Sequence, residues 1–148
     1  MRVANDILIP ELARLLQDGK EVRFTPSGIS MRPFIEGDKD SVILAPVQTP
    51  HIGDIILAQV QTADRRIMYV LHRLVRIENN IYTLQGDGNL RGEEQCLRQD
   101  IIGRVVQIER PSGKRKCLTK GRIWYHLFPM RKWLLKIYRH SWLKWCYN

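Results

Sequence analysis

The sequence RIMYVLHRLVRIENNIYTLQGD, residues 66 to 87, has the pattern of two strands joined by a tight turn. Two β-rich runs flank Asn79-Asn80, and asparagine accepts the positive φ angles that two-residue hairpin turns require. Further β-rich runs, bordered mostly by Gly-Asp or proline, occupy residues 21–26, 40–47, 53–60 and 100–110. About six short strands at roughly regular spacing predict a mainly β fold, a coiled antiparallel sheet or partly closed barrel.

Helical patterns lie on either side of these strands. Residues 5–18 are predicted to form a helix that Asn5 or Asp6 caps, with Pro10 near its first turn. The polar stretch 110–116 reads as a linker, and the apolar residues after it recur three or four apart until Pro129 breaks the pattern into a short and a longer helix. The predicted organisation is therefore a domain over residues 1–110 and a helical tail over residues 111–148.

The chain has 148 residues and a formal charge of +9, which is unevenly distributed. Residues 110–148 contain 11 lysines and arginines and no acidic residue. The first 109 residues contain the remaining 13 basic residues and all 15 acidic ones, a net charge of −2. This asymmetry indicates an anionic partner for the tail, either lipid headgroups or nucleic acid.

Other features exclude several classes of protein. The three cysteines are far apart and form no CxxC motif, so neither a disulfide framework nor a zinc site is expected, and no cofactor is predicted. No run of about 18 apolar residues occurs, and the N-terminal stretch lacks the features of a secretory signal. We therefore expect a protein that is cytoplasmic or peripheral at the inner face of the cell membrane.

The stretch PSGISMRP, residues 26 to 33, contains a serine that a turn does not need. A nucleophilic serine requires a base within hydrogen-bond reach and donors for the oxyanion. His72 in the long strand is the candidate base for Ser30, and Asp87 at a strand end is the candidate orienting carboxylate. Each of the three also has an ordinary structural reading, as a turn serine, a strand histidine and a turn aspartate.

The order SGISMRP, GDIILAQV, VLHRLVRI, YTLQGDGN and IIGRVVQI resembles the signal peptidase and LexA-type serine peptidase superfamily over about residues 21–110. The resemblance implies that Ser30 is the nucleophile, within an S-M-x-P motif completed by Met31 and Pro33. The usual base is a lysine, and His72 at that point resembles the endoplasmic-reticulum and SipW-type branch. Asp87 matches the aspartate of that branch, whereas Gly88 departs from its usual asparagine or alanine.

This resemblance implies a serine-type endopeptidase that removes leader or signal peptides by a Ser-His(-Asp) mechanism. Two departures favour a small variant leader-peptide peptidase. Signal peptidases of this type normally carry a transmembrane anchor, which is not expected here. The self-cleaving repressors carry a DNA-binding domain and an internal Ala-Gly or Cys-Gly site, and about 20 residues before the first strand leave no room for that domain.

In the expected mechanism Ser30 attacks the scissile carbonyl, His72 acts as base and then acid, and Asp87 fixes the imidazole tautomer. The Ser30 backbone N–H and the Ser27 hydroxyl are candidate oxyanion donors. Met31 and Pro33 are expected to shape the turn and a hydrophobic substrate face. The neighbouring Arg73 reads either as a structural or orienting residue or as one partner of a surface ion pair.

Two questions remain open at the level of sequence. The domain could be a catalytically inactive relative that binds peptides on its edge strands rather than a peptidase acting on a peptide or preprotein. The region from Trp124 to Trp145 mixes cations with bulky apolar residues, which is typical of a helix in a membrane interface, but its apolar stripe could instead pack on the domain. Nucleic acid is the less favoured partner, because no recognition motif accompanies the basic residues.

Overall fold

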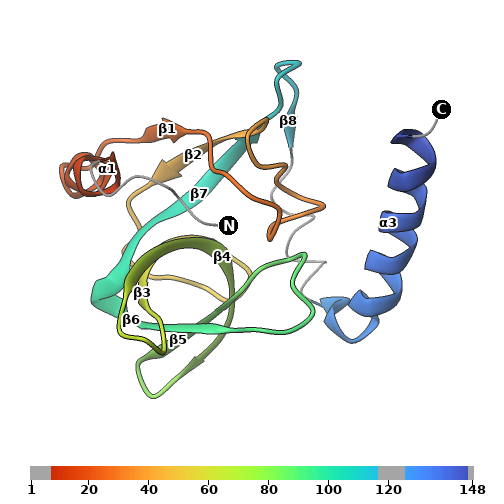
Figure 1. Ribbon diagram of the computed structural model, residues 1–148. Helices are drawn as coiled ribbons and strands as arrows, with labels where there is room; N and C mark the ends of the chain where they lie inside the picture. The colour runs from red at the N-terminus through yellow and green to blue at the C-terminus, as the bar shows by residue number, and fades with distance from the viewer. Residues whose placement is uncertain (1–7, 117–125, 147–148) are drawn as a thin grey trace.

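The computed structural model describes residues 8–116 and 126–146, and its β-strands form one antiparallel sheet (Figure 1). The strands follow one another in the order β1-β2-β7-β3-β4-β5-β6, and β8 pairs with β7. Their bounds are β1 Val22–Phe24, β2 Ser41–Ala45, β3 Ile55–Gln61, β4 Ile67–Glu78, β5 Ile81–Gln85, β6 Glu94–Leu97, β7 Ile101–Glu109 and β8 Arg115–Lys116. The prediction of a mainly β, antiparallel fold is confirmed, and the sheet is not closed into a barrel.

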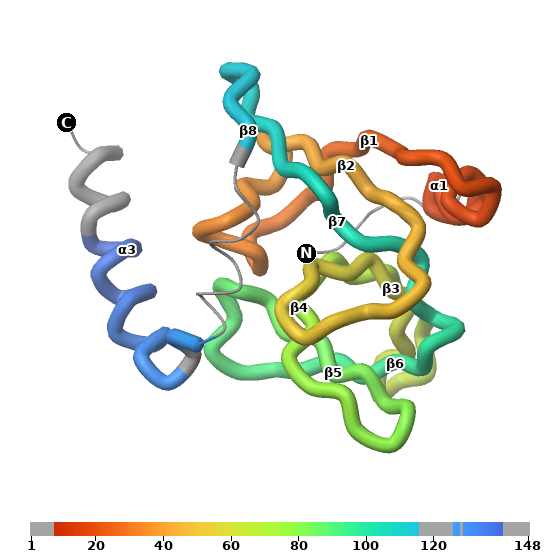
Figure 2. The backbone as a smooth tube through the Cα atoms, turned by 180° about the vertical axis from the view of Figure 1, so that it is seen from behind, coloured from red at the N-terminus to blue at the C-terminus, as the bar shows by residue number. Residues whose placement is uncertain are grey.

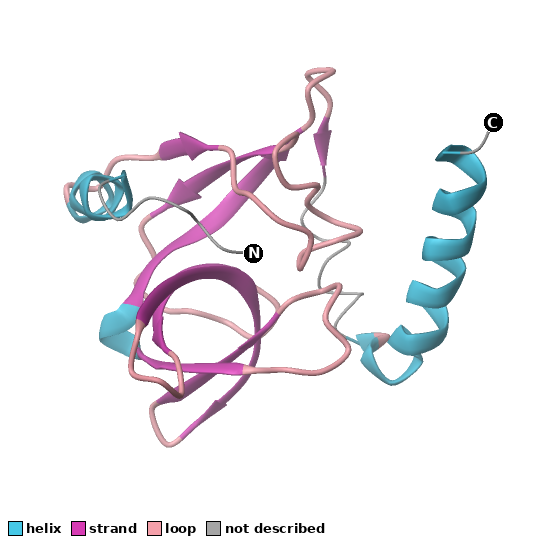
Figure 3. Ribbon diagram, in the orientation of Figure 1, coloured by secondary structure: helices cyan, strands magenta, loops and turns pink. Residues whose placement is uncertain are grey.

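Helices occupy the two ends of the described chain (Figure 3). Helix α1, Leu8–Gln17, packs its buried Ile9, Leu12 and Leu16 into the sheet, and three of the residues predicted for this helix, 5–7, lie outside the described residues. Two single-turn 3₁₀ helices are η1, Arg98–Asp100, and η2, Phe128–Met130. Helix α3, Arg131–Cys146, follows η2, so Pro129 lies in a short turn that precedes the longer helix.

The β4–β5 hairpin forms as its sequence predicts. Asn79 and Asn80 have φ angles of 49° and 63°, and Glu78 pairs with Ile81 across the turn. The register shifts between Leu74 and Arg76, which is a β-bulge. Bulges increase the local twist of a strand, and the long strand β4 accordingly bends around one half of the molecule (Figure 1).

Strand β3 is buried on both faces because it separates two hydrophobic clusters. Ile55 and Leu57 face the cluster that contains the apolar residues of α1, while Ile56, Ala58 and Val60 face the second cluster. Successive residues of a strand point to opposite faces, so a nearly continuous apolar run can supply both clusters. The same alternation in β4 decides which side chains meet at the site.

Two elements differ from the sequence-based expectation. Residues 110–116 were expected to be a linker, but they form a turn and the strand β8, whose Lys116 pairs with Ile108 of β7. This correction follows from Gly113, whose φ of 77° allows the chain to reverse. Strand β6 was not predicted, because Glu94–Leu97 is short and lacks a run of β-branched or aromatic residues.

No helix in the described ranges 8–116 and 126–146 is both long and apolar enough to cross a lipid bilayer. The short helix expected before Pro129 falls mostly on residues 117–125, outside the described part of the chain, as does Trp124.

Candidate active site

Ser30, His72 and Glu94 form a hydrogen-bonded chain. The Ser30 Oγ lies 2.9 Å from His72 Nε2, and His72 Nδ1 lies 2.8 Å from Glu94 Oε2. An imidazole protonated on Nδ1 donates to Glu94 and leaves Nε2 free to accept the Ser30 hydroxyl proton. This is the nucleophile–base–orienter arrangement of serine hydrolases, with glutamate as the third member.

The position of His72 follows from strand alternation. Val70 and Leu74, two residues before and after His72, belong to the second hydrophobic cluster, and Ile56 of that cluster is the cross-strand partner of His72. Only 2% of His72 is exposed, so the strand and its neighbours fix the ring. Glu94 opens β6 on the face that also carries Cys96 of the second cluster. His72 and Glu94 therefore approach each other at the edge of one apolar cluster.

The prediction that Asp87 orients His72 is wrong. Both Asp87 carboxylate oxygens accept hydrogen bonds from Arg73, at 2.7 Å from Nε and 2.6 Å from Nη2. Arg73 follows His72 in β4, so its side chain leaves the strand on the opposite face, and its ring contact is with Phe34, 5.3 Å from the ring centroid. Asp87 is fully buried with this partner, and the carboxylate on the histidine is Glu94.

The pair of Arg73 and Asp87 holds the loop that contacts the turn of Ser30. Arg73 Nη1 also donates to the Gly53 carbonyl, at 2.7 Å. Burial raises the pKa of the Asp87 carboxyl, and the two hydrogen bonds from Arg73 oppose that rise. The next residue, Gly88, donates its backbone N–H to the Ser30 carbonyl at 2.7 Å. Arg73 is thus a buried structural residue, not a partner in a surface ion pair.

The turn that carries Ser30 is closely packed on the glycines of residues 86–88. A Cβ at Gly86 would lie 2.6 Å from the Ser30 carbonyl oxygen, and a Cβ at Gly88 would lie 3.1 Å from that of Arg32 and 3.2 Å from that of Ile29. Gly88, where the resemblance leads one to expect asparagine or alanine, therefore has a steric role. The two glycines let the loop approach the backbone of the turn that carries Ser30.

The remaining residues of the motif have different roles. Met31 is fully buried in the first cluster and accepts backbone hydrogen bonds from Phe34 and Ile35, so it anchors the turn and offers no substrate face. Pro33 follows a cis peptide bond after Arg32. Among the described residues no side-chain hydrogen bond joins Ser27 to Ser30 or His72. The apolar side chain that the turn exposes is Ile29.

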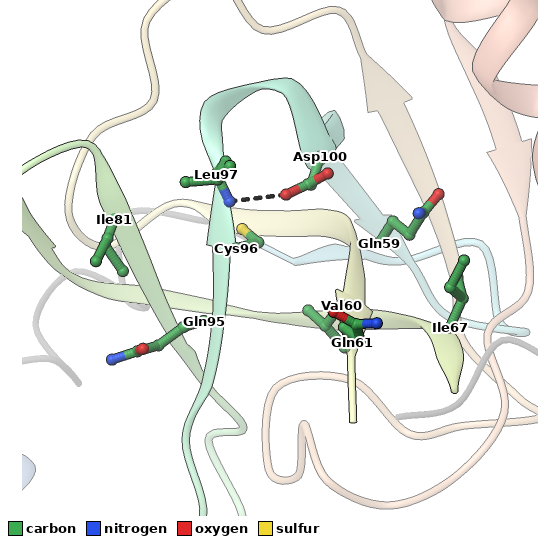
Figure 4. A pocket seen from close by; sticks show the side chains of 9 residues that line it. All are labelled: Gln59, Val60, Gln61, Ile67, Ile81, Gln95, Cys96, Leu97 and Asp100. Atoms are coloured by element: carbon green, nitrogen blue, oxygen red, sulfur yellow. Dashed lines mark hydrogen bonds between the residues drawn. The ribbon is translucent and has the colours of Figure 1, made fainter. Parts of the chain in front are cut away.

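A hollow of about 420 Å³ lies beside the start of β4, away from His72 (Figure 4). Its lining combines the amides Gln59, Gln61 and Gln95 with Ile67 and Ile81. The thiol of Cys96 is also there, and burial raises its pKa to about 12. A thiol with so high a pKa stays protonated, so this hollow offers no nucleophile. Within the described ranges, no three histidine, cysteine or acidic side chains are grouped to hold a metal ion.

Comparison of the chain with protein-family models, with curated proteins and with solved structures gives no significant match. The sequence indicated Ser30 and His72 and missed Glu94. The available signal was the alternation of Glu94 and Cys96 in a short run that could pair with β5.

Proposed function

We propose that the protein is a serine endopeptidase that cleaves a leader or signal peptide with Ser30, His72 and Glu94. The observation that carries this proposal is the 2.9 Å contact between Ser30 Oγ and His72 Nε2, with Glu94 on the other ring nitrogen. A turn serine and a strand histidine with purely structural roles have no need of this contact. The order of motifs over residues 21–110, which resembles the signal peptidase and LexA-type superfamily, gives independent support.

The chemistry follows from the three side chains. Ser30 Oγ bonds to the carbonyl carbon of the substrate while its proton passes to His72 Nε2, and Glu94 stabilises the imidazolium that forms. His72 then gives the proton to the leaving amine, and the acyl group stays on Ser30. A water molecule, deprotonated by His72, hydrolyses the ester and restores the serine. The Ser30 backbone N–H is the proposed oxyanion donor.

The test is cleavage of a peptide library derived from a proteome, with new amino termini labelled and identified by mass spectrometry. We expect new termini with the wild-type chain and none above background with Ser30→Ala or His72→Ala. Ser112→Ala, in the exposed β7–β8 turn, is the matched control and should cleave like the wild type. The same termini produced by Ser30→Ala would refute the proposal.

A catalytically inactive peptide-binding module is the alternative. It predicts that the wild-type chain and Ser30→Ala bind the same library peptides equally and that neither cleaves them. The carboxylate on His72 Nδ1 favours the peptidase, because a binding surface has no use for an oriented imidazole.

We also propose that α3 attaches the protein to an anionic membrane surface. Met130, just before α3, and Trp133 and Ile137 within it are exposed and spaced three and four residues apart. Lys132 and Lys136 are exposed beside them. In such attachment, apolar side chains enter the membrane interface and cations contact anionic headgroups. Each lysine or arginine near the surface contributes about 1 kcal/mol to the binding free energy. The stripe of Met130, Trp133 and Ile137 is exposed, whereas Leu135 on the same helix is buried.

Flotation with phosphatidylglycerol-containing vesicles tests the attachment. We expect co-flotation that weakens with Trp133→Ala, with Lys132→Glu plus Lys136→Glu, and with neutral phosphatidylcholine vesicles. Ile67→Ala, on an exposed residue of β4, is the matched apolar control and should float normally. Salt-sensitive binding to DNA without binding to anionic vesicles would favour nucleic acid instead and would contradict the membrane assignment.

A further inference from the structure

A cavity of about 330 Å³ lies between α3 and the turn that carries Ser30, which is called the nucleophile turn. Ile29 and Arg32 of the turn line one side, and Leu135, Tyr138 and Arg139 of α3 line the other. Gly88 and Asn89 complete the lining from the loop after β5. Figures 1 and 2 both show α3 beside this loop, apart from the sheet.

Helix α3 is held in this position by contacts with the domain. The Arg131 guanidinium is buried and donates through Nη2 to the Asn89 carbonyl, and its charge opposes the rise in the pKa of Asp87 that burial causes. Leu135, one turn later, is also buried. The inner face of α3 therefore belongs to the site region, while its outer face carries the exposed stripe of Met130, Trp133 and Ile137.

We propose that this cavity is a substrate subsite for a large apolar or aromatic side chain that adjoins an acidic residue of the peptide. The inference rests on the proposed peptidase function and names its substrate class. The cavity volume is within the range of about 300–1,000 Å³ found for ligand pockets, which is more than a small side chain fills. The subsite depends on α3, which lies outside the region of family resemblance.

The lining matches that side chain. Ile29, 63% exposed, and Leu135 offer aliphatic surface, and Tyr138 offers an aromatic ring. Arg139 is exposed, and among the described residues it forms no ion pair. Its guanidinium is available to a carboxylate of the peptide. Arg32 is paired with Glu36 and adds positive charge on the opposite side.

The cavity is close to the bond that would be cleaved. Ile29 precedes the nucleophile directly, and Gly88, also in the lining, donates to the Ser30 carbonyl. An extended peptide advances about 3.3 Å per residue. A side chain in this cavity therefore belongs to a residue within a few positions of the scissile bond.

The first test is binding, which does not require turnover. Ser30→Ala, labelled with ¹⁵N, is titrated with N-acetyl-Phe-Asp-amide, and its amide resonances are followed by NMR. We expect shifts at Ile29, Gly88, Leu135 and Tyr138, with affinity about 10-fold weaker for N-acetyl-Ala-Asp-amide. Shifts with neither probe, or equal affinity for both, would overturn the subsite even if the wild-type chain cleaves peptides.

The second test is selectivity in the cleavage assay. Wild-type cleavage sites should be enriched about 10-fold in large apolar residues at one position, with an acidic residue beside it. Tyr138→Ala should weaken the first preference, and Arg139→Glu should abolish the second. Arg110→Glu, an equal charge reversal in the exposed β7–β8 turn, is the control. Cleavage with unchanged preferences in both α3 variants would overturn the subsite, whereas probe binding without any cleavage would overturn the peptidase function alone.

Discussion

Two carboxylates next to β4 have distinct partners and are predicted to have distinct effects. Glu94 contacts His72 Nδ1, whereas the Asp87 carboxylate accepts its two side-chain hydrogen bonds from the Arg73 guanidinium. In a serine hydrolase, loss of the orienting carboxylate leaves the wrong imidazole tautomer. Measurements of kcat and of melting temperature can therefore distinguish the roles of Glu94 and Asp87.

Glu94→Gln should lower kcat by up to about 10⁴-fold, because the amide no longer selects the Nδ1-protonated ring. Its melting temperature should change little, since Glu94 is partly exposed. Asp87→Asn should instead lower the melting temperature, because Arg73 then loses its buried counter-charge. A larger loss of kcat per folded molecule in Asp87→Asn than in Glu94→Gln would reverse these assignments.

Arg73→Leu should cost about 3–5 kcal/mol in the free energy of unfolding, because it leaves the buried Asp87 carboxylate without a partner. Chemical denaturation measures this loss. Arg23→Leu is the control, since its ion pair with Glu109 involves a side chain that is 62% exposed. That exposed pair should contribute about 1 kcal/mol or less. Equal losses in the two variants would mean that the Arg73 pair is not structurally important.

The sequence identified Ser30 and His72 because the ordered motifs around them resemble the signal peptidase and LexA-type superfamily, whereas residue type alone left each with an ordinary structural reading. It did not identify Glu94, because acidic residues are common and only pairing of β6 with β5 brings this one to the histidine. Asp87 was misassigned because a carboxylate at this strand end could contact either His72 or the adjacent Arg73 of β4. Strand alternation decides between His72 and Arg73, and that decision requires the register.

At the scale of elements, the loop after β5 positions the nucleophile turn through close backbone contact. Gly86→Ala places a Cβ 2.6 Å from the Ser30 carbonyl oxygen, so one of the two loops must move. We expect a loss of at least about 10²-fold in kcat/KM, since small displacements of a nucleophile are costly. Gly103→Ala is the control, because its Cβ would meet the Leu16 side chain far from the site and should affect stability but not the activity of folded molecules.

Strand β6 carries a second titratable group, Cys96, whose burial raises its thiol pKa from 9.0 to about 12. The folded state therefore retains the proton when the unfolded chain has lost it. Cys96 contributes stability that is complete below about pH 9 and is lost as the pH rises towards 12. Denaturation of the wild type and Cys96→Val between pH 8 and about pH 11 should show a steeper decline for the wild type. Parallel declines would contradict the burial of this thiol.

The elements themselves were mostly foreseeable. Asn79-Asn80 predicts the β4–β5 hairpin. The continuous apolar run of residues 55–60 predicts β3, which is buried on both faces. Strands β6 and β8 were not foreseen, because each is short and exists only through pairing with a longer neighbour. Local pattern is sufficient for the long strands and insufficient for edge strands.

At the scale of the whole molecule, the charge asymmetry of the sequence corresponds to a spatial separation between the sheet and the basic helix α3 (Figure 1). Strands β4 and β6 carry His72 and Glu94, and the basic helix α3 lies beside the turn that carries Ser30. One face of α3 borders the proposed subsite and the other exposes Trp133 and Ile137. If α3 binds a membrane through this stripe, as proposed, its opposite face still borders the turn that carries Ser30.

The proposed peptidase function requires that Ser30 and His72 act together on a peptide bond. The decisive measurement is kcat/KM for one cleaved library peptide with Ser30→Ala, His72→Ala and the double variant. We predict that each single variant loses roughly 10⁴–10⁶-fold and that the double variant is no slower than either, because removal of one member already disables the unit. Losses that multiply in the double variant, or normal cleavage by His72→Ala, would contradict the account.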